Sequence, residues 1–306
     1  MIPKELYLVS RSPQLLSEAD AVQKGKSVHA YIIEGAAGIG KKSLAIALAS
    51  AILCTSNEPP CFLCSACSRI IKGQHPDAHF VSEEKSIKVD TIREMLATTS
   101  ITAYEGGKKI YIINNFHTAT EQAQNALLKT LEEPPASVVF LLLADNIEQL
   151  LPTVRSRCRT IRLYGFSISE IKEQLQLLFP DKTNIQQVAE ECGGNIGKAI
   201  ELLNNEEYWN LRTLALSMLN ETGSIPYLAQ KLEKNKESLS GILEILEELL
   251  RVKMQNSQGT QERTIFLEQL KAVTEAQLLR KKNVNAGLII DELAYGLAKG
   301  GVKWQR

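Results

Sequence analysis

Residues 35–43 read GAAGIGKKS, and this stretch decides how the rest of the chain is interpreted. It follows the β-rich apolar run VHAYIIEG (28–35) and precedes KKSLAIALASAILC (41–54), in which Leu, Ile and Ala recur at helical spacing. A strand, a glycine loop and a helix in this order are typical of a phosphate-binding loop, whose backbone amides close around a phosphate. The alternative is a tight strand-to-helix turn without a ligand. The glycines of the predicted loop are Gly35, Gly38 and Gly40.

One position of this loop departs from the usual pattern. Lys41 matches the lysine of the pattern, which would contact the outer phosphates. In the usual pattern the next residue is a Ser or Thr that holds magnesium. This sequence has Lys42 there, and Ser43 follows one residue too late. The loop therefore keeps the glycine scaffold but lacks the usual metal-binding hydroxyl.

Composition limits the possible classes of protein. The chain has 306 residues, enough for two or three domains, and 35 Lys and Arg residues balance 35 Asp and Glu residues. A formal net charge of zero gives no strong general attraction to nucleic acid. The first residues lack the apolar core of a signal peptide, and no apolar run is long enough to cross a membrane. We therefore expect a cytoplasmic protein that does not bind membranes.

The first half of the chain alternates apolar strands with helical stretches, which indicates a parallel sheet covered on both faces. After about residue 166 the pattern becomes helical, beginning with a capping box of Ser167 and Glu170. A glycine break at 192–197 separates two short helical segments, and longer helical runs such as 237–254 follow. The predicted strands are YIIEG (31–35), AHFVSEE (78–84), KKIYIINN (108–115), VVFLLLADN (138–146) and RTIRL (159–163).

Four cysteines lie close together after the predicted P-loop helix, with the spacing C-x6-C-x2-C-x2-C. Two-residue gaps allow neighbouring thiolates to bind one tetrahedral ion, and four sulfur ligands leave no position for a catalytic water. The pattern predicts a structural zinc site, and the alternative is four free or buried thiols. Cys158 and Cys192 stand alone and are expected to be small buried residues. The predicted zinc ligands are Cys54, Cys61, Cys64 and Cys67.

Two further motifs accompany the P-loop and the cysteine module: NALLKTLEEPP (125–135) and SRC (156–158). Together these features resemble the AAA+ clamp-loader subunits of bacterial DNA polymerase III. The resemblance is specific over residues 28–163 and extends to the helical remainder in layout only. It implies an α/β AAA+ domain with a parallel sheet, a small helical lid domain and an all-helical collar domain. The implied boundaries are 1–165, with the zinc module at 54–67 inserted, then 166–205 and 206–306.

The resemblance also implies a defective nucleotide site. Active motors of the family end the third strand with Asp-Glu, whereas this chain has Asn114 and Asn115, and an uncharged amide cannot take a proton from water. Ala144 aligns with a polar sensor, and Gly197 aligns with the lid arginine of the motors. We therefore expect ATP or ADP to bind without turnover, or the loop to stay empty. These features fit the delta-prime class, which usually lacks ATPase activity.

Arg157, in the SRC motif, is the predicted catalytic residue. In the clamp-loader family this arginine enters the nucleotide site of a neighbouring subunit as an arginine finger, a role that suits a permanently charged, forked guanidinium. Without the resemblance, the basic run around it would be interpreted as a solvated turn or a contact to a DNA phosphate.

The resemblance implies partners as well. They are the tau/gamma and delta subunits, with the sliding clamp and primer-template DNA contacted through the assembled complex, as part of a DNA polymerase holoenzyme. Two alternatives stay open: an ATP-hydrolysing tau/gamma motor, and a zinc-containing DNA-binding module that acts alone. Trp209 and Trp304 are expected to anchor the helical bundle.

Overall fold

The computed structural model describes residues 2–105, 107–220, 224–257 and 259–299. By its contacts the chain divides into two compact units, Met1–Leu203 and Asn204–Arg306. Each unit has its own hydrophobic core.

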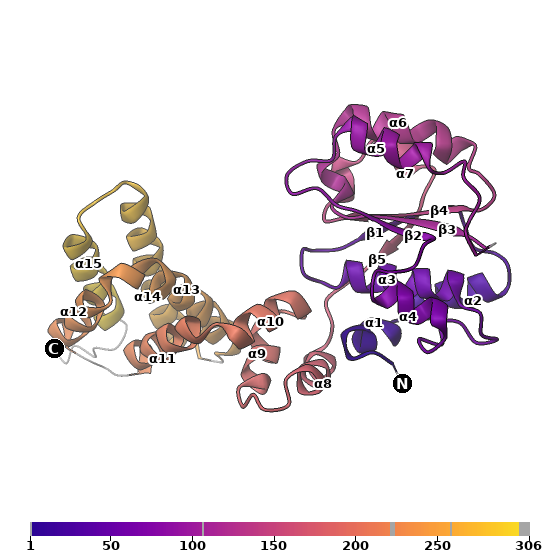
Figure 1. Ribbon diagram of the computed structural model, residues 1–306. Coiled ribbons are helices and arrows are strands. Elements are labelled where there is room, and N and C mark those ends of the chain that lie inside the picture. Colours follow the sequence, from indigo (N-terminus) through magenta and orange to yellow (C-terminus); the bar gives the residue numbers. More distant parts are fainter. Residues whose placement is uncertain (1, 106, 221–223, 258, 300–306) are drawn as a thin grey trace. The chain divides into compact units, whose positions relative to one another are not determined.

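The first unit is built on a sheet of five parallel strands in the order β2-β3-β4-β1-β5 (Figure 1). The central strand β4 and its neighbour β3 are buried along their whole length, because helices cover both faces of a parallel sheet. All five predicted strands are present, each ending a few residues earlier than the apolar run suggested. The strands are β1 (Ala30–Glu34), β2 (Ala78–Val81), β3 (Lys109–Ile113), β4 (Val138–Ala144) and β5 (Arg159–Arg162).

Two layers of helices enclose this sheet (Figure 1). One face carries a core cluster that includes Leu44 and Leu48 of α3 and Ile70 of α4, and the other carries one that includes Ile92 of α5 and Leu127 of α6. The parallel α/β architecture predicted from the sequence is therefore confirmed. The first layer comprises α1 (Tyr7–Ser10), α2 (Pro13–Gln23), α3 (Lys41–Leu53) and α4 (Ser65–Ile71), and the second comprises α5 (Val89–Ala97), α6 (Glu121–Glu132) and α7 (Pro152–Arg155). Short 3-10 turns lie at η1 (Lys4–Leu6), η2 (Phe116–Thr118) and η3 (Ile147–Gln149).

Three helices after the sheet complete the first unit: α8 (Ile168–Leu178), α9 (Ile185–Glu191) and α10 (Ile196–Asn204). The capping box of Ser167 and Glu170 at the start of α8 is confirmed. The buried Gln174 of α8 fixes this helix to the amino terminus, because its amide nitrogen donates to the Lys4 carbonyl at 2.7 Å and its amide oxygen accepts from the Leu8 amide at 3.0 Å. Both polar ends of a buried amide are thus satisfied within the chain.

The second unit is helical throughout its described residues. Its core joins leucine, isoleucine and alanine side chains of all five of its long helices. Trp209, in α11, is half-buried with the Arg212 guanidinium 5.5 Å from its ring centroid, whereas Trp304 lies outside the described residues. The helices are α11 (Glu206–Asn220), α12 (Ile225–Lys234), α13 (Leu239–Asn256), α14 (Thr260–Lys281) and α15 (Ala286–Lys299), with the 3-10 turn η4 (Lys236–Ser238) before α13.

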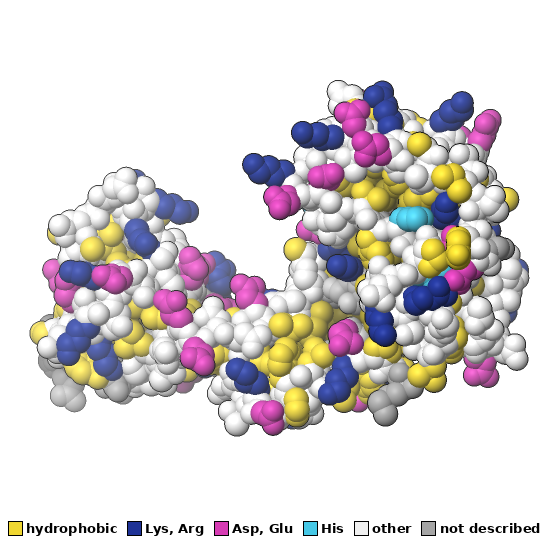
Figure 2. Space-filling view, in the orientation of Figure 1, with side chains coloured by type: hydrophobic (Ala, Val, Ile, Leu, Met, Phe, Trp, Pro, Cys, Tyr) yellow, Lys and Arg dark blue, Asp and Glu magenta, His cyan; other side chains and the backbone are white. Residues whose placement is uncertain are grey.

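The surface carries both signs of charge. On the face shown in Figure 2, basic and acidic side chains are interspersed rather than gathered into a basic stripe, in keeping with the zero formal net charge. Within the described ranges, no helix combines the length and the apolar character that crossing a bilayer would require.

Candidate functional site

The glycine loop between β1 and α3 has the backbone that its sequence requires. Gly38 and Gly40 have φ angles of +79° and +109°, in the region that favours glycine. Gly35 is restricted by space, since a Cβ atom there would lie 2.9 Å from the Leu163 carbonyl oxygen. Gly40 ends the loop as the N-cap of α3, so the loop leads directly into a helix N-terminus, where anions are favoured.

The positive charge of Lys41 in this loop is compensated by groups of the chain itself. Lys41 is only 7% exposed. Its Nζ donates to the carbonyl oxygens of Gly35 at 2.8 Å and Ala36 at 2.9 Å, and it lies 2.7 Å from Oδ1 of Asp145. A lysine ammonium has three donors, and these three oxygens account for all of them. A phosphate at this position would have to displace Asp145.

Asp145 directly follows Ala144, the last residue of β4. Its backbone amide donates to Nδ1 of His117 at 3.2 Å, which fixes the turn from which the carboxylate extends. The carboxyl ends of parallel strands meet at one edge of a sheet, and P-loop chemistry is found at such an edge. Asp145 was not among the predicted site residues, although its place at the end of the fourth predicted strand puts it at this edge.

A cavity of about 590 Å³ opens over the loop, a volume within the usual range for small-molecule sites. Its polar part includes Lys42, Ser43, Asn114 and Asn115 together with Asp145. Strand β3 is thus followed by the amide side chains of Asn114 and Asn115, and not by carboxylates. Its apolar part is formed by Leu8, Val9, Leu178, Phe179, Ile196 and Ile200.

Helix α10 is seated on the loop by direct polar contacts. Asn195 donates through Nδ2 to the Ala37 carbonyl at 2.7 Å, and the Gly197 amide donates to the Gly38 carbonyl at 2.8 Å. A Cβ atom on Gly197 would lie 2.7 Å from the Gly38 Cα atom, closer than real Cβ contacts. Position 197 thus has no room for a side chain in this arrangement.

The neighbouring Lys198 takes a structural role at the same helix start. Its backbone amide donates to Oδ1 of Asn195 at 3.0 Å, and its Nζ donates to the Glu191 carbonyl at 3.3 Å. The carbonyl lies at the end of α9, where a cation is favoured by the helix dipole.

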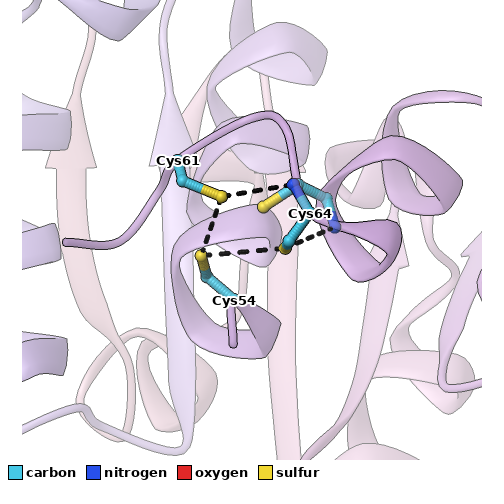
Figure 3. Close-up of side chains that lie close together, drawn as sticks. Cys54, Cys61 and Cys64 are labelled. Carbon is cyan, nitrogen blue, oxygen red and sulfur yellow. Dashed lines mark hydrogen bonds between the residues drawn. The ribbon is translucent and has the colours of Figure 1, made fainter. Parts of the chain in front are cut away.

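The four cysteines of the predicted zinc site lie together at the end of α3 and the start of α4, and Figure 3 shows Cys54, Cys61 and Cys64 pointing toward one another. All four sulfur atoms are within 4.8 Å of one another, and Cys54 Sγ lies 3.5 Å from that of Cys61 and 4.0 Å from that of Cys64. Tetrahedral zinc with zinc–sulfur bonds of about 2.3 Å places its ligands about 3.8 Å apart. The donor set and its spacing therefore fit a closed tetrahedral metal site.

Backbone amides support the thiolate state of two of these ligands. Burial alone would raise the pKa of Cys64, but hydrogen bonds from the backbone of Cys67 and Thr55 outweigh it and lower that pKa to about 6. Backbone hydrogen bonds from Leu63 and Cys64 lower the pKa of Cys61. Burial raises the pKa values of Cys54 and Cys67. Deprotonated thiolates are what a metal ion binds.

Arg157 lies at the other edge of the sheet, in the turn between α7 and β5. Its Nη2 is 2.7 Å from Oε1 of Glu132, and its Nη1 donates to the Thr153 carbonyl at 2.8 Å and to Oγ of Ser156 at 3.3 Å. Because Arg159 pairs in register with Tyr31 at the start of β1, the glycine loop after β1 is about 13 Å further along the strands. Arg157 is therefore placed away from the loop of its own chain.

Comparisons with known proteins relate this chain to subunits of DNA polymerase III, and the family model that matches lies within the first unit. The family described as "DNA polymerase III, delta subunit" matches residues 13–167. The delta' subunit of DNA polymerase III from Bacillus subtilis is 32% identical over 203 residues, which are 65% of this chain and 61% of that protein. The delta' subunit from Pseudomonas aeruginosa is 40% identical over 141 residues, or 44% and 43% of the two chains.

A tau subunit of DNA polymerase III is similar as well. The tau subunit from Salmonella typhimurium is 32% identical over 216 residues, which are 70% of this chain and 32% of tau. This chain thus matches less than two thirds of the length of each of these relatives. Among solved structures, the gamma subunit-related protein of Thermotoga maritima aligns with 94% of this chain and 100% of its own, at 18% identity and a TM-score of 0.43.

Neutralising Asp145 is expected to open the loop to phosphate. Asp145→Asn keeps an oxygen beside Lys41 but removes the negative charge that competes with phosphate, so the Kd of the isolated protein for a fluorescent ATP analogue should fall about three- to tenfold. The matched control is Glu148→Gln, which changes an exposed acid three residues away. An unchanged Kd in Asp145→Asn would show that this ion pair does not limit binding.

The cysteine pKa values predict an order of alkylation in the metal-free protein. A pKa near 6 leaves Cys64 mostly as thiolate at pH 7, whereas Cys67 is buried with a raised pKa and stays a thiol. Iodoacetamide should therefore modify Cys64 at least about tenfold faster than Cys67, as followed by mass spectrometry.

Zinc should suppress the reaction of all four ligands. The control is Cys158, whose pKa burial raises to about 12, and which should react slowly with or without zinc. Equal rates at Cys64 with and without zinc would contradict the metal site.

Proposed function

We propose, because this chain belongs to the DNA polymerase III delta-subunit family, that it acts as the delta-prime subunit of a bacterial clamp loader. In this role it is a stator-like AAA+ component of the polymerase holoenzyme, and it supplies Arg157 to the nucleotide site of a neighbouring motor subunit. Its partners are the tau/gamma and delta subunits, and it meets the sliding clamp and primer-template DNA through the assembled complex. It works in the cytoplasm.

The observation that carries this proposal is the contrast between the two edges of the sheet. At one edge the phosphate-binding Lys41 is neutralised by Asp145, and Asn114 and Asn115 stand where a motor needs carboxylates. At the other edge Arg157 is fixed by three contacts on the surface. A chain whose own nucleotide site lacks catalytic carboxylates, and whose surface presents an arginine for a neighbour's site, has the chemistry of a trans-acting subunit.

The remaining assignments follow the same proposal. Residues 1–165 form the AAA+ domain, 166–205 the lid and 206–306 the collar through which the subunits associate. Cys54, Cys61, Cys64 and Cys67 hold one structural Zn²⁺, which ties the end of α3 to the start of α4. The loop stays empty, or it takes ATP or ADP without hydrolysing it.

A tau/gamma motor is the second candidate, because the tau subunit of Salmonella typhimurium is as similar in sequence as the delta' subunit from Bacillus subtilis. Asn114, Asn115 and the Lys41–Asp145 pair count against it. A zinc-containing DNA-binding module that acts alone is disfavoured by the zero net charge.

The purified protein alone should not hydrolyse ATP. With magnesium and saturating ATP, its rate should equal that of Lys41→Ala, because no carboxylate follows β3 to hold the metal or polarise water. Steady-state phosphate release measures this. Turnover that Lys41→Ala abolishes would favour the motor.

Arg157→Ala should depress ATP hydrolysis by the assembled complex. An arginine finger contributes about three to five orders of magnitude in related enzymes, so kcat of the site that this subunit completes should become undetectable, and DNA-stimulated hydrolysis by the whole complex should fall. The control is Arg155→Ala, at the end of α7 two residues earlier and paired with Glu148 at 2.7 Å. Equal DNA-stimulated rates in the Arg157→Ala and unmodified complexes would refute the finger.

A further inference from the structure

Arg157 lines a second cavity, of about 490 Å³, at the edge of the sheet where the strands begin. The walls come from the residues that lead into four strands: 27–30 before and at the start of β1, Lys108 before β3, 134–138 before β4, and 156–159 before β5. Parallel strands all begin on the same side, so this amino-edge pocket lies opposite the edge that carries the glycine loop.

The amino-edge pocket is basic. Lys108, Arg157 and Arg159 all line it, and none of the described lining residues is acidic. Cys158, between the two arginines, adds no negative charge, since burial raises the pKa of its thiol to about 12.

Each of the three cations is oriented by a partner that leaves part of its donor set for a ligand. Lys108 Nζ donates to the Ala136 carbonyl at 2.6 Å, and Arg159 Nη2 lies 2.8 Å from the nearly buried carboxylate of Glu18. Neither Glu18 nor Glu132, the partner of Arg157, lines the pocket. Since a guanidinium has five N–H donors and an ammonium has three, the cations are held in place without being fully used.

We propose that Lys108 and Arg159 bind, together with Arg157, the phosphate groups of the nucleotide carried by the neighbouring motor subunit. This inference rests on the proposed function and enlarges the contact from one finger to three cations. A nucleoside triphosphate carries three to four negative charges, and forked guanidinium groups match phosphate oxygens in geometry.

The three cations have different effects on the kinetics. Arg157 meets charge that develops during phosphoryl transfer and acts on kcat. Lys108 and Arg159 bind phosphates that are charged in the ground state and in the transition state alike, and loss of such uniform binding raises KM while kcat is retained.

The test uses the assembled clamp loader with Lys108→Gln or Arg159→Lys in this subunit. Initial rates at increasing ATP concentrations should give a KM about three- to tenfold higher for each variant, with kcat changed by less than about twofold. Arg159→Lys is chosen because it keeps a cation beside Glu18, whose other carboxylate oxygen is buried without a hydrogen-bond partner among the described residues. The matched control is Arg155→Gln, which removes a positive charge at the end of α7, outside the pocket.

The outcomes separate this inference from the proposed function. Unchanged KM in both variants, with kcat lowered by Arg157→Ala, would overturn the three-cation contact and leave the finger standing. No effect of any variant, Arg157→Ala included, would refute the proposed function itself. Unchanged KM together with weaker, less salt-dependent binding of primed DNA would assign the pocket to a nucleic-acid backbone and likewise overturn the inference.

Discussion

The common direction of the five strands is the constraint on which both candidate sites depend. In a parallel sheet every strand begins at one edge and ends at the other, so each edge collects the loops of one kind. Gly35–Lys41, Asn114 and Asp145 follow strands and meet at the carboxyl edge. Lys108, Arg157 and Arg159 precede or begin strands and meet at the amino edge. One topology therefore gives a single domain two sites with different chemistry.

Charge distinguishes these two sites. At the carboxyl edge the carboxylate of Asp145 occupies the position beside Lys41 that a phosphate would need. At the amino edge the acidic partners, Glu18 and Glu132, hold the cations from outside the pocket. A carboxylate that lies inside a site repels an anionic ligand and cancels much of the attraction of the cation that it pairs with. A carboxylate that lies outside the site is further from the ligand and cancels less of that attraction. The amino edge is thus the better place for a phosphate.

The sequence predicted the elements whose signals are local. Continuous apolar runs identified all five strands, Ser167 and Glu170 identified the start of α8, and cysteine spacing identified a group of sulfurs that the structure brings within 4.8 Å. It did not predict the short helix α1, which has four residues and depends on the contact between Leu8 and Gln174, 166 positions away. Helices of this length have little stability of their own, so tertiary contacts decide them.

The same limit applies within the site. A glycine pattern predicts the loop, but the closure of Lys41 depends on a side chain 104 positions later, and the packing of Gly197 depends on Gly38. The role of Arg157 stays a prediction, since its contacts within one chain fix its position and say nothing of what it meets across an interface.

Helices α8 and α10 are attached to the rest of the first unit by hydrogen bonds within the chain. In a motor, the lid follows the nucleotide because an arginine of the lid binds the terminal phosphate. Here α10 bonds to the carbonyls of Ala37 and Gly38, and α8 bonds to Lys4 and Leu8. These contacts all join groups of the chain itself. Hydrogen bonds of the chain itself therefore hold α8 and α10 in place, and the proposed delta-prime role would use helices held in this way.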